Sequence, residues 1–335
     1  MLGMLEEMVS GVQQQQRSTL GVAVDRLANL LTGGGRSLAD QGGGRLEFET
    51  DLAVRPLVGA EAPPAEVWAV DGGQALVADA RCLQLVVARA ARVCFRRGAC
   101  EAEDEGELRA WLLGGDEDRA VAAGLGMGIA ADAAVDLNLL RDVEEWRAVD
   151  RCIEDASPEA VVLVDGDLEP DWRVAPWWFA ELLSRAAARR VVVAAVTKRS
   201  SLSRGGAPLL GGLELEAALA FGPRALWWAP VARSRAGARV VAARLDPDAP
   251  YAFRVDLSPG VEPEPALAGL AALCDDAGFP GYPYPLTVAD RLAACPSWLR
   301  QDTWFEVDDL LDRAGVPAEV RTRAFSDRHD LMERY

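Results

Sequence analysis

Residues 67–73 read VWAVDGG, an apolar run that ends in the carboxylate Asp71 and two glycines. The stretch VVLVDGDL at 161–168 has the same form, with Asp165 after four apolar residues. Short apolar runs bounded by turn residues are typical of buried strands. Because α/β sheets carry their sites at the carboxyl ends of strands, we expect Asp71 and Asp165 to lie together at such an edge. The alternative is that each Asp-Gly pair only forms a turn that ends its strand.

The order of elements outward from these stretches predicts an α/β fold, a mixed sheet flanked by helices. The expected strands lie at 67–70, 75–80, 83–95, 161–164, 191–196, 226–229, 240–245 and 251–255. The expected helices lie at 1–32, 132–155, 177–190, 213–219, 263–277, 287–294 and in the tail to 335. The first three strands are too close together for crossovers and should be antiparallel, whereas those alternating with helices should be parallel. The acidic segment 101–118 is expected to be solvated surface with a short helix.

Three segments are expected along the chain. Residues 1–45 form an N-terminal helical segment and a glycine-rich loop, suited to a dimer or partner contact. Residues 46–295 form the core, and residues 296–335 form a C-terminal helical extension.

Composition narrows the class of protein. The 335 residues are 50% hydrophobic, which is ample for a sizeable core, and the formal net charge is −17. Such an acidic chain is not a typical free nucleic-acid binder, although local arginines, metals or a basic partner can offset the repulsion. The N-terminus lacks the pattern of a signal peptide, no apolar run is long enough to span a membrane, and the six cysteines contain no CxxC pair. We therefore expect a cytoplasmic protein with reduced thiols.

Two desolvated carboxylates at one sheet edge repel each other strongly. Divalent cations relieve such repulsion, and oxygen ligands favour Mg²⁺ or Mn²⁺. Paired carboxylates can hold two metal ions for phosphoryl displacement.

Further acids are expected to join this pair. On the helix at 132–155, Glu144 borders the apolar face centred on Val143 and can lean toward the sheet, whereas Glu145 points almost opposite and should be solvated. Asp136 on the same helix is a reserve candidate. Asp290 is expected in the first turn of its helix, where a dipole-capping role competes with metal binding. The single histidine, His329, lies in a polar tail and is expected to be a surface residue.

These residues, taken in order, resemble the NurA nuclease family. The matching pieces are VWAVDGG at 67–73, LLRDVEEW at 139–146, VVLVDGDL at 161–168, VVAAVTKRSSL at 192–202 and GYPYPLTVADRLA at 281–293. The resemblance implies an RNase H-like core and a Mn²⁺- or Mg²⁺-dependent nuclease, with two ions, that acts on 5′ ends and single strands of DNA. It also implies a homodimer docked on a hexameric HerA-type translocase in end resection for double-strand break repair, and hence a nucleoid-associated protein.

By position, the resemblance assigns the metal ligands to Asp71, Glu144 (Glu145 if the register slips) and Asp165. Asp290 stands where many family members carry a histidine ligand, so this chain departs from the family there.

Lys198 is the only lysine among 35 basic residues and directly follows the strand expected at 191–196. Within the nuclease reading, its compact ammonium would contact the scissile phosphate, where a guanidinium would be too broad. Arg199, Arg204 and Arg173 are candidates to grip the DNA backbone. Tyr282 and Tyr284 are candidates to stack on a terminal base or to orient the last core helix.

Two other functions fit the same sequence. Asp-Gly loops after strands also occur in actin-like ATPases and sugar kinases, although no adenosine motif is evident late in this chain. An inactive adapter that keeps the fold and only binds a partner would be consistent with Asp290 and with the acidic charge.

Overall fold

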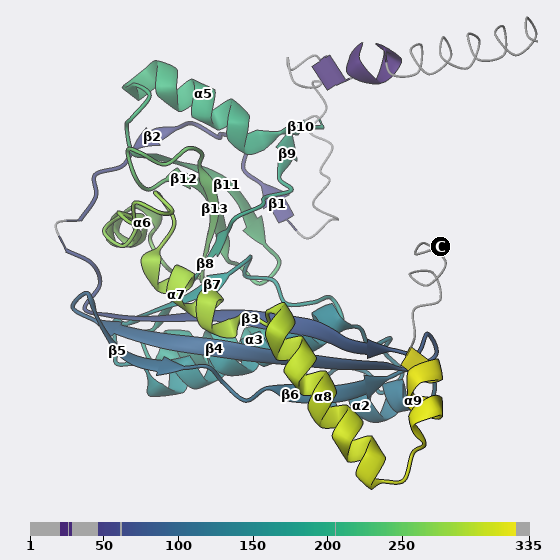
Figure 1. Ribbon diagram of the computed structural model, residues 1–335. Coiled ribbons are helices and arrows are strands. Elements are labelled where there is room, and N and C mark those ends of the chain that lie inside the picture. Colours follow the sequence, from purple (N-terminus) through teal and green to yellow (C-terminus); the bar gives the residue numbers. More distant parts are fainter. Residues whose placement is uncertain (1–20, 26, 29–45, 61, 205, 326–335) are drawn as a thin grey trace, which may run out of the picture.

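A computed structural model of the chain (Figure 1) describes residues 21–25, 27–28, 46–60, 62–204 and 206–325. Residues 21–25 and 27–28 are helical, as expected for the N-terminal segment. The rest of the helix expected at 1–32, the glycine-rich loop at 33–45 and His329 lie outside the described residues.

The architecture is a large mixed sheet with helices on both faces, which confirms the expected fold class (Figure 1). Its strand order is β1-β11-β12-β13-β8-β7-β3-β4-β5, with β2 paired to β11 and β6 paired to β4. The strands of this sheet are β1 (Leu46–Phe48), β2 (Arg55–Pro56), β3 (Glu66–Asp79), β4 (Gln84–Arg96), β5 (Ala99–Asp104), β6 (Arg109–Leu113), β7 (Val161–Asp165), β8 (Val192–Thr197), β11 (Trp227–Ser234), β12 (Arg239–Arg244) and β13 (Phe253–Leu257). A separate short pair is formed by β9 (Ser203–Arg204) and β10 (Ala207–Pro208).

The pairing directions follow the spacing of the strands along the chain. Strands β3, β7 and β8 are parallel, and a helix connects β7 to β8. Strands β3 and β4 are antiparallel, as are the pairs β8–β13, β13–β12 and β12–β11. The prediction for the acidic segment 101–118 was wrong in part: half of it belongs to β5 and β6, which both pair with β4 and leave their outer side chains in solvent.

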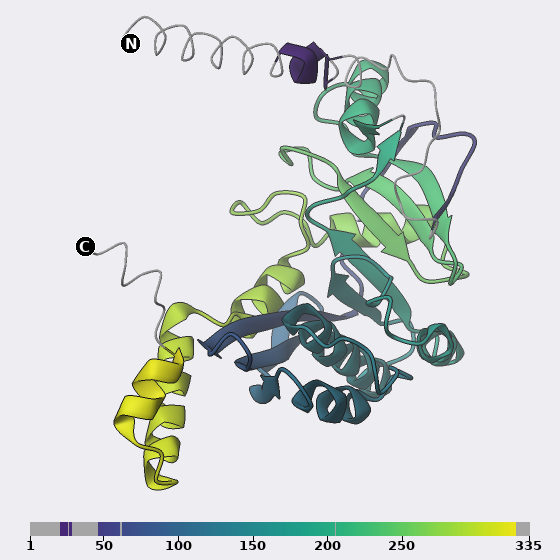
Figure 2. The same ribbon diagram turned by 90° about the vertical axis from the view of Figure 1, so that its right-hand side faces the viewer.

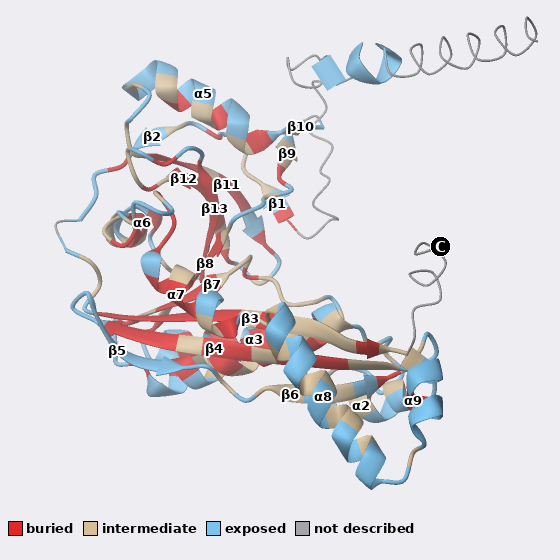
Figure 3. Ribbon diagram, viewed as in Figure 1, coloured by how far each residue is buried: buried red, intermediate tan, exposed pale blue. Residues whose placement is uncertain are grey.

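Two helical layers cover the sheet. The helices are α2 (Glu117–Leu125), α3 (Leu137–Asp155), α4 (Pro176–Ala188), α5 (Leu209–Phe221), α6 (Pro263–Ala271), α7 (Tyr284–Ala293), α8 (Ser297–Arg313) and α9 (Ala318–Phe325). Alternate residues of the central strands pack against α3 and α4 on one face and against α6 and α7 on the other. The buried residues concentrate in the central strands and the inner sides of these helices (Figure 3), whereas α8 has no buried residue and projects from the core with α9 (Figure 2).

Strand β3 differs from the sequence-based expectation. The strands expected at 67–70 and 75–80 are one continuous strand, so Asp71 lies within β3 and not at its end. Its parallel neighbour β7 does end at Asp165, and beyond that level β3 continues paired with β4. Asp71 therefore lies at the level where β7 ends and β3 continues without its parallel neighbour.

Close packing explains the two glycines after Asp71. Neither has a backbone conformation that requires glycine. A Cβ on Gly72 would lie 2.3 Å from Oε1 of Glu145 on α3, and a Cβ on Gly73 would lie 1.8 Å from the carbonyl oxygen of Ala293 at the end of α7. The absent side chains thus let α3 and α7 approach β3 from opposite faces.

Helix α7 begins at Tyr284, three residues earlier than expected, with prolines in its first turn. Proline is well tolerated there because its missing N–H has no helical partner. Asp290 consequently lies near the end of the helix and not in its first turn, so the expected dipole-capping alternative was wrong.

Among the described residues, the helices are all too short or too polar to cross a membrane.

We predict that Gly73→Ala destabilises the protein by about 1–3 kcal/mol or more, because helix α7 must move away from β3 to admit a methyl group. The matched control is Gly212→Ala in α5, where a Cβ would meet nothing within 4 Å and alanine should be neutral or slightly stabilising. Urea unfolding of both variants measures the difference. Equal stabilities would show that the α7–β3 contact is not tight.

Candidate metal centre

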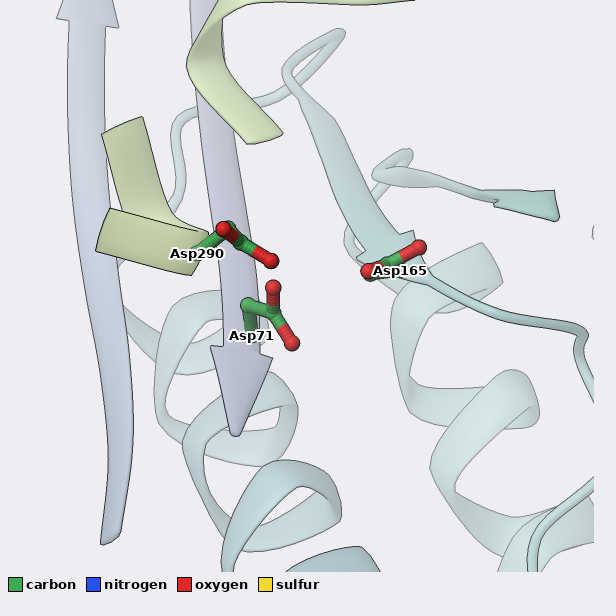
Figure 4. Close-up of side chains that lie close together, drawn as sticks. All are labelled: Asp71, Asp165 and Asp290. Atoms are coloured by element: carbon green, nitrogen blue, oxygen red, sulfur yellow. The ribbon is translucent and has the colours of Figure 1, made fainter. Parts of the chain in front are cut away.

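Three carboxylates from distant parts of the chain converge on one point. Oxygen atoms of Asp71 on β3, Asp165 at the end of β7 and Asp290 on α7 all lie within 4.8 Å of one another. Figure 4 shows Asp290 and Asp71 directed toward each other, with Asp165 across from them on the neighbouring strand. Asp71 is buried, Asp165 is half-buried and Asp290 is exposed, so the group opens to solvent on one side.

Strand periodicity and register produce this convergence. Val70 pairs with Val164 in the parallel ladder, so Asp71 and Asp165 stand at the same level one residue later. Successive side chains alternate between faces, which puts both carboxylates on the face covered by α7. Asp290 reaches them because Gly73 allows the end of α7 to rest on the strand. The expected proximity of Asp71 and Asp165 is confirmed.

The electrostatics of the group favour a bound cation. Burial raises the pKa of Asp71 to about 9, and the negative charges of Asp165 and Glu145 add to the rise. Burial also raises the pKa of Glu145 to about 8, against the lowering effect of Arg141. Burial thus disfavours the charged form of both acids, and a divalent ion bound beside them would favour it.

The prediction that Glu145 is solvated was wrong. Glu145 is buried against Gly72, and its negative charge helps to raise the pKa of Asp71. Glu144, the favoured candidate, instead accepts hydrogen bonds from Arg147 and Arg109, the latter on β6. The apolar-face argument failed because α3 is buried on several sides, by the sheet, by α2 and by α4.

Lys198, directly after β8, joins the acidic group. Its Nζ donates to Oδ2 of Asp165 at 2.8 Å and to Oδ1 of Asp290 at 3.1 Å. The same ammonium lies 5.0 Å from the centre of the Tyr282 ring, a cation–π contact. Tyr282 is 3% exposed, and burial raises the pKa of its hydroxyl, with Asp165 and Asp71 adding to the effect. The sequence suggested that Tyr282 stacks on a terminal base or orients the last core helix; its contact with the lysine is evident only from the fold.

The structure does not bring the other candidates into this group. Asp136 caps α3 by accepting from the backbone N–H of Leu139, and Arg173 is held by Asp171 and Asp136 with its side chain only 6% exposed. Arg173 is therefore a structural residue, contrary to the suggested DNA contact.

Three further candidates for DNA contact lie at the surface. Arg199 follows Lys198, and Arg204 lies on β9; both are exposed. Tyr284 opens α7 and packs edge-on against Phe95 with its ring centre 5.8 Å away, six residues before Asp290. At the helical rise this separation is about 9 Å along the axis.

A buried ion pair fixes the loop after Asp165. Arg254 and Asp256 on β13 are 5% and 1% exposed and hydrogen bond to each other. Asp256 accepts from the backbone N–H of Leu168, and Arg254 reaches Asp167 at 3.2 Å. These bonds hold residues 165–168 against the sheet and so fix the direction of Asp165.

Arg89 on β4 fixes the other side of the centre. It lies opposite Gly73 in the β3–β4 ladder and donates to the carbonyl oxygens of Ala293 and Ala294. The last carbonyls of a helix lack helical partners, so Arg89 completes the end of α7 one turn after Asp290.

Comparison with known proteins gives a similarity of fold. No family model matches the chain, and no curated protein matches its sequence. Among solved structures, the NurA nuclease from Sulfolobus solfataricus matches over 90% of this chain and 97% of its own, with a TM-score of 0.54 and 14% identity. A second NurA structure matches over 84% and 93%, with a TM-score of 0.47 and 8% identity. The catalytic domain of human endonuclease V matches over 79% and 92%, with a TM-score of 0.40 and 14% identity. At these identities the first match establishes the fold and leaves the activity open.

We predict that the metal-free protein loses stability as the pH rises from about 5 to about 9. In this range native Asp71, with its pKa raised to about 9, keeps a proton that the unfolded chain, with its usual value of 3.8, has released. The native state then binds more protons than the unfolded state, so the free energy of unfolding falls with pH, by up to about 1.4 kcal/mol per pH unit for this group.

Asp71→Asn removes the titrating group, and its pH profile in EDTA should be flatter than that of the wild type. Urea unfolding at several pH values gives both profiles. Parallel profiles would contradict the raised pKa of Asp71.

Proposed function

We propose that this chain, which has the fold of the NurA nucleases, is a divalent-metal-dependent deoxyribonuclease that hydrolyses phosphodiester bonds at 5′ ends and in single strands. The observation that carries the proposal is the convergence of Asp71, Asp165 and Asp290 within 4.8 Å on that fold.

The donor set fits a hard divalent cation. All three side chains offer carboxylate oxygens, the ligands that Mg²⁺ and Mn²⁺ prefer. Burial, with the nearby charges of Asp165 and Glu145, raises the pKa of Asp71, and a divalent cation beside it would favour its ionised form. Asp71, Asp165 and Asp290 would hold the ion, and Glu145 would add negative charge from the other face of β3. When bound, a divalent ion lowers the pKa of water and polarises a phosphoryl oxygen.

The chain's own residues supply binding and orientation. Lys198 carries a positive charge at the open side of the group, where it would contact a non-bridging oxygen of the scissile phosphate. The ring of Tyr282 stabilises the ammonium through a cation–π contact. Arg199 and Arg204, exposed on the following segment, would bind the DNA backbone, and Tyr284 would stack on a terminal base.

We also propose that the protein works in the nucleoid with a HerA-type hexameric translocase, as a homodimer, in end resection for double-strand break repair. The family resemblance suggests this partnership, and the net charge of −17 supports it. An acidic nuclease is weakly attracted to free DNA and would gain from a partner that delivers the strand.

We predict that the purified full chain cleaves 5′-labelled single-stranded DNA in Mn²⁺, and that Asp71→Asn lowers the rate at least about 100-fold. Loss of residues that merely support metal ligands already costs about 10–100-fold. The matched control is Asp79→Asn on the same strand, whose carboxylate accepts a hydrogen bond from the backbone N–H of Arg81. This control should keep the wild-type rate.

The same assay separates the alternatives. Metal-dependent ATP turnover without DNA cleavage would favour the actin-like or sugar-kinase-like ATPase. Absence of both activities, also with a translocase present, would favour the adapter and refute the nuclease.

A further prediction concerns the partner. A HerA-type translocase from the same source, with ATP, should raise the cleavage rate at least about tenfold, because tethering increases the local concentration of substrate. A translocase variant that binds but does not hydrolyse ATP is the control. An unchanged rate with the active translocase would count against the partnership.

A further inference from the structure

Lys198 combines an unusual residue choice with an unusual position. The chain uses arginine for every basic residue except this one. The exception lies directly after β8, where the structure places it between two of the three clustered carboxylates. A guanidinium is planar, broad and extended, whereas an ammonium is a compact point charge. The position is therefore one that suits a small cation.

The surroundings of the ammonium resemble those of a bound cation. Asp165 and Asp290 accept from Nζ at 2.8 Å and 3.1 Å, and the face of the Tyr282 ring lies 5.0 Å away. The third carboxylate has a different partner: Asp71 accepts from the backbone N–H of Gly72 at 2.7 Å.

The three carboxylates can bind one divalent ion in addition to the ammonium of Lys198. Each carboxylate bound to Lys198 has a second oxygen, and these can face Asp71. A second divalent ion held by Asp165 and Asp290 would have to share their oxygens with the ammonium and would be repelled by it.

We propose that Lys198 is the built-in second cation of this centre, so that the chain binds a single divalent ion, held with Asp71, while the lysine fills the place between Asp165 and Asp290. This inference rests on the proposed function and replaces the pair of ions expected from the sequence. It also gives a reason for the carboxylate at Asp290, which pairs with the ammonium.

The test is the number of Mn²⁺ ions bound by the full-length chain, measured by calorimetric titration and by electron paramagnetic resonance. The wild type should bind one ion per chain and show no coupling between manganese ions. Lys198→Met keeps the length of the side chain, removes its charge, and should bind two ions with a coupled spectrum. Lys198→Gln is a second variant in case methionine disturbs the fold, and circular dichroism checks both.

The double variant Lys198→Met with Asp290→Asn is the matched control, and it should return to one ion. Two ions in the wild type, or one ion in both single variants, would overturn the inference. DNA cleavage measured on the same samples separates the two proposals. Two ions with cleavage would refute only the built-in cation, whereas one ion without cleavage, also with a translocase present, would refute only the nuclease. A wild type that binds no Mn²⁺ would refute both.

Discussion

The close approach of two helices to one strand is the constraint on which the rest of this structure depends. Helix α3 brings Glu145 against Gly72, and helix α7 rests its last carbonyls on Gly73 from the other face. A Cβ at Gly73 would meet the backbone of α7, and a Cβ at Gly72 would displace the side chains of Glu145 and Arg141. The two glycines thus act by their lack of volume and not by a special backbone conformation. They hold carboxylates from both helical layers close to the one on β3, where burial and the neighbouring negative charges raise the pKa of Asp71.

Much of this arrangement could be predicted from local pattern. Two apolar runs that each end in Asp-Gly predicted neighbouring strands with carboxylates at one level, and the β3–β7 register confirms that Asp71 and Asp165 are level. The mixed sheet followed from the spacing of strands and helices. The continuity of β3 did not, because a Gly-Gly pair in sequence is indistinguishable from a turn until the helices that pack on it are known.

The helical acids show where such reasoning stops. A helical wheel assumes one buried face, but α3 is enclosed by the sheet and by two helices, so both Glu144 and Glu145 are buried. Which of the two acids faces the site depends on the charged side chains around it. Glu144 forms ion pairs with Arg147 and Arg109 instead. Asp290 was assigned to the wrong end of its helix because prolines 283 and 285 were read as a loop, whereas proline in a first turn is compatible with a helix.

The hydrogen bonds from Arg89 to the end of α7 also bear on the helices that follow. Helix α8 starts only a few residues after the carbonyls that Arg89 holds, and it lies on the surface along its whole length. The outer helices are thus joined to the sheet twice: through the Arg89 contacts at the end of α7, and through the contacts of α8 with β3, the strand that carries Asp71.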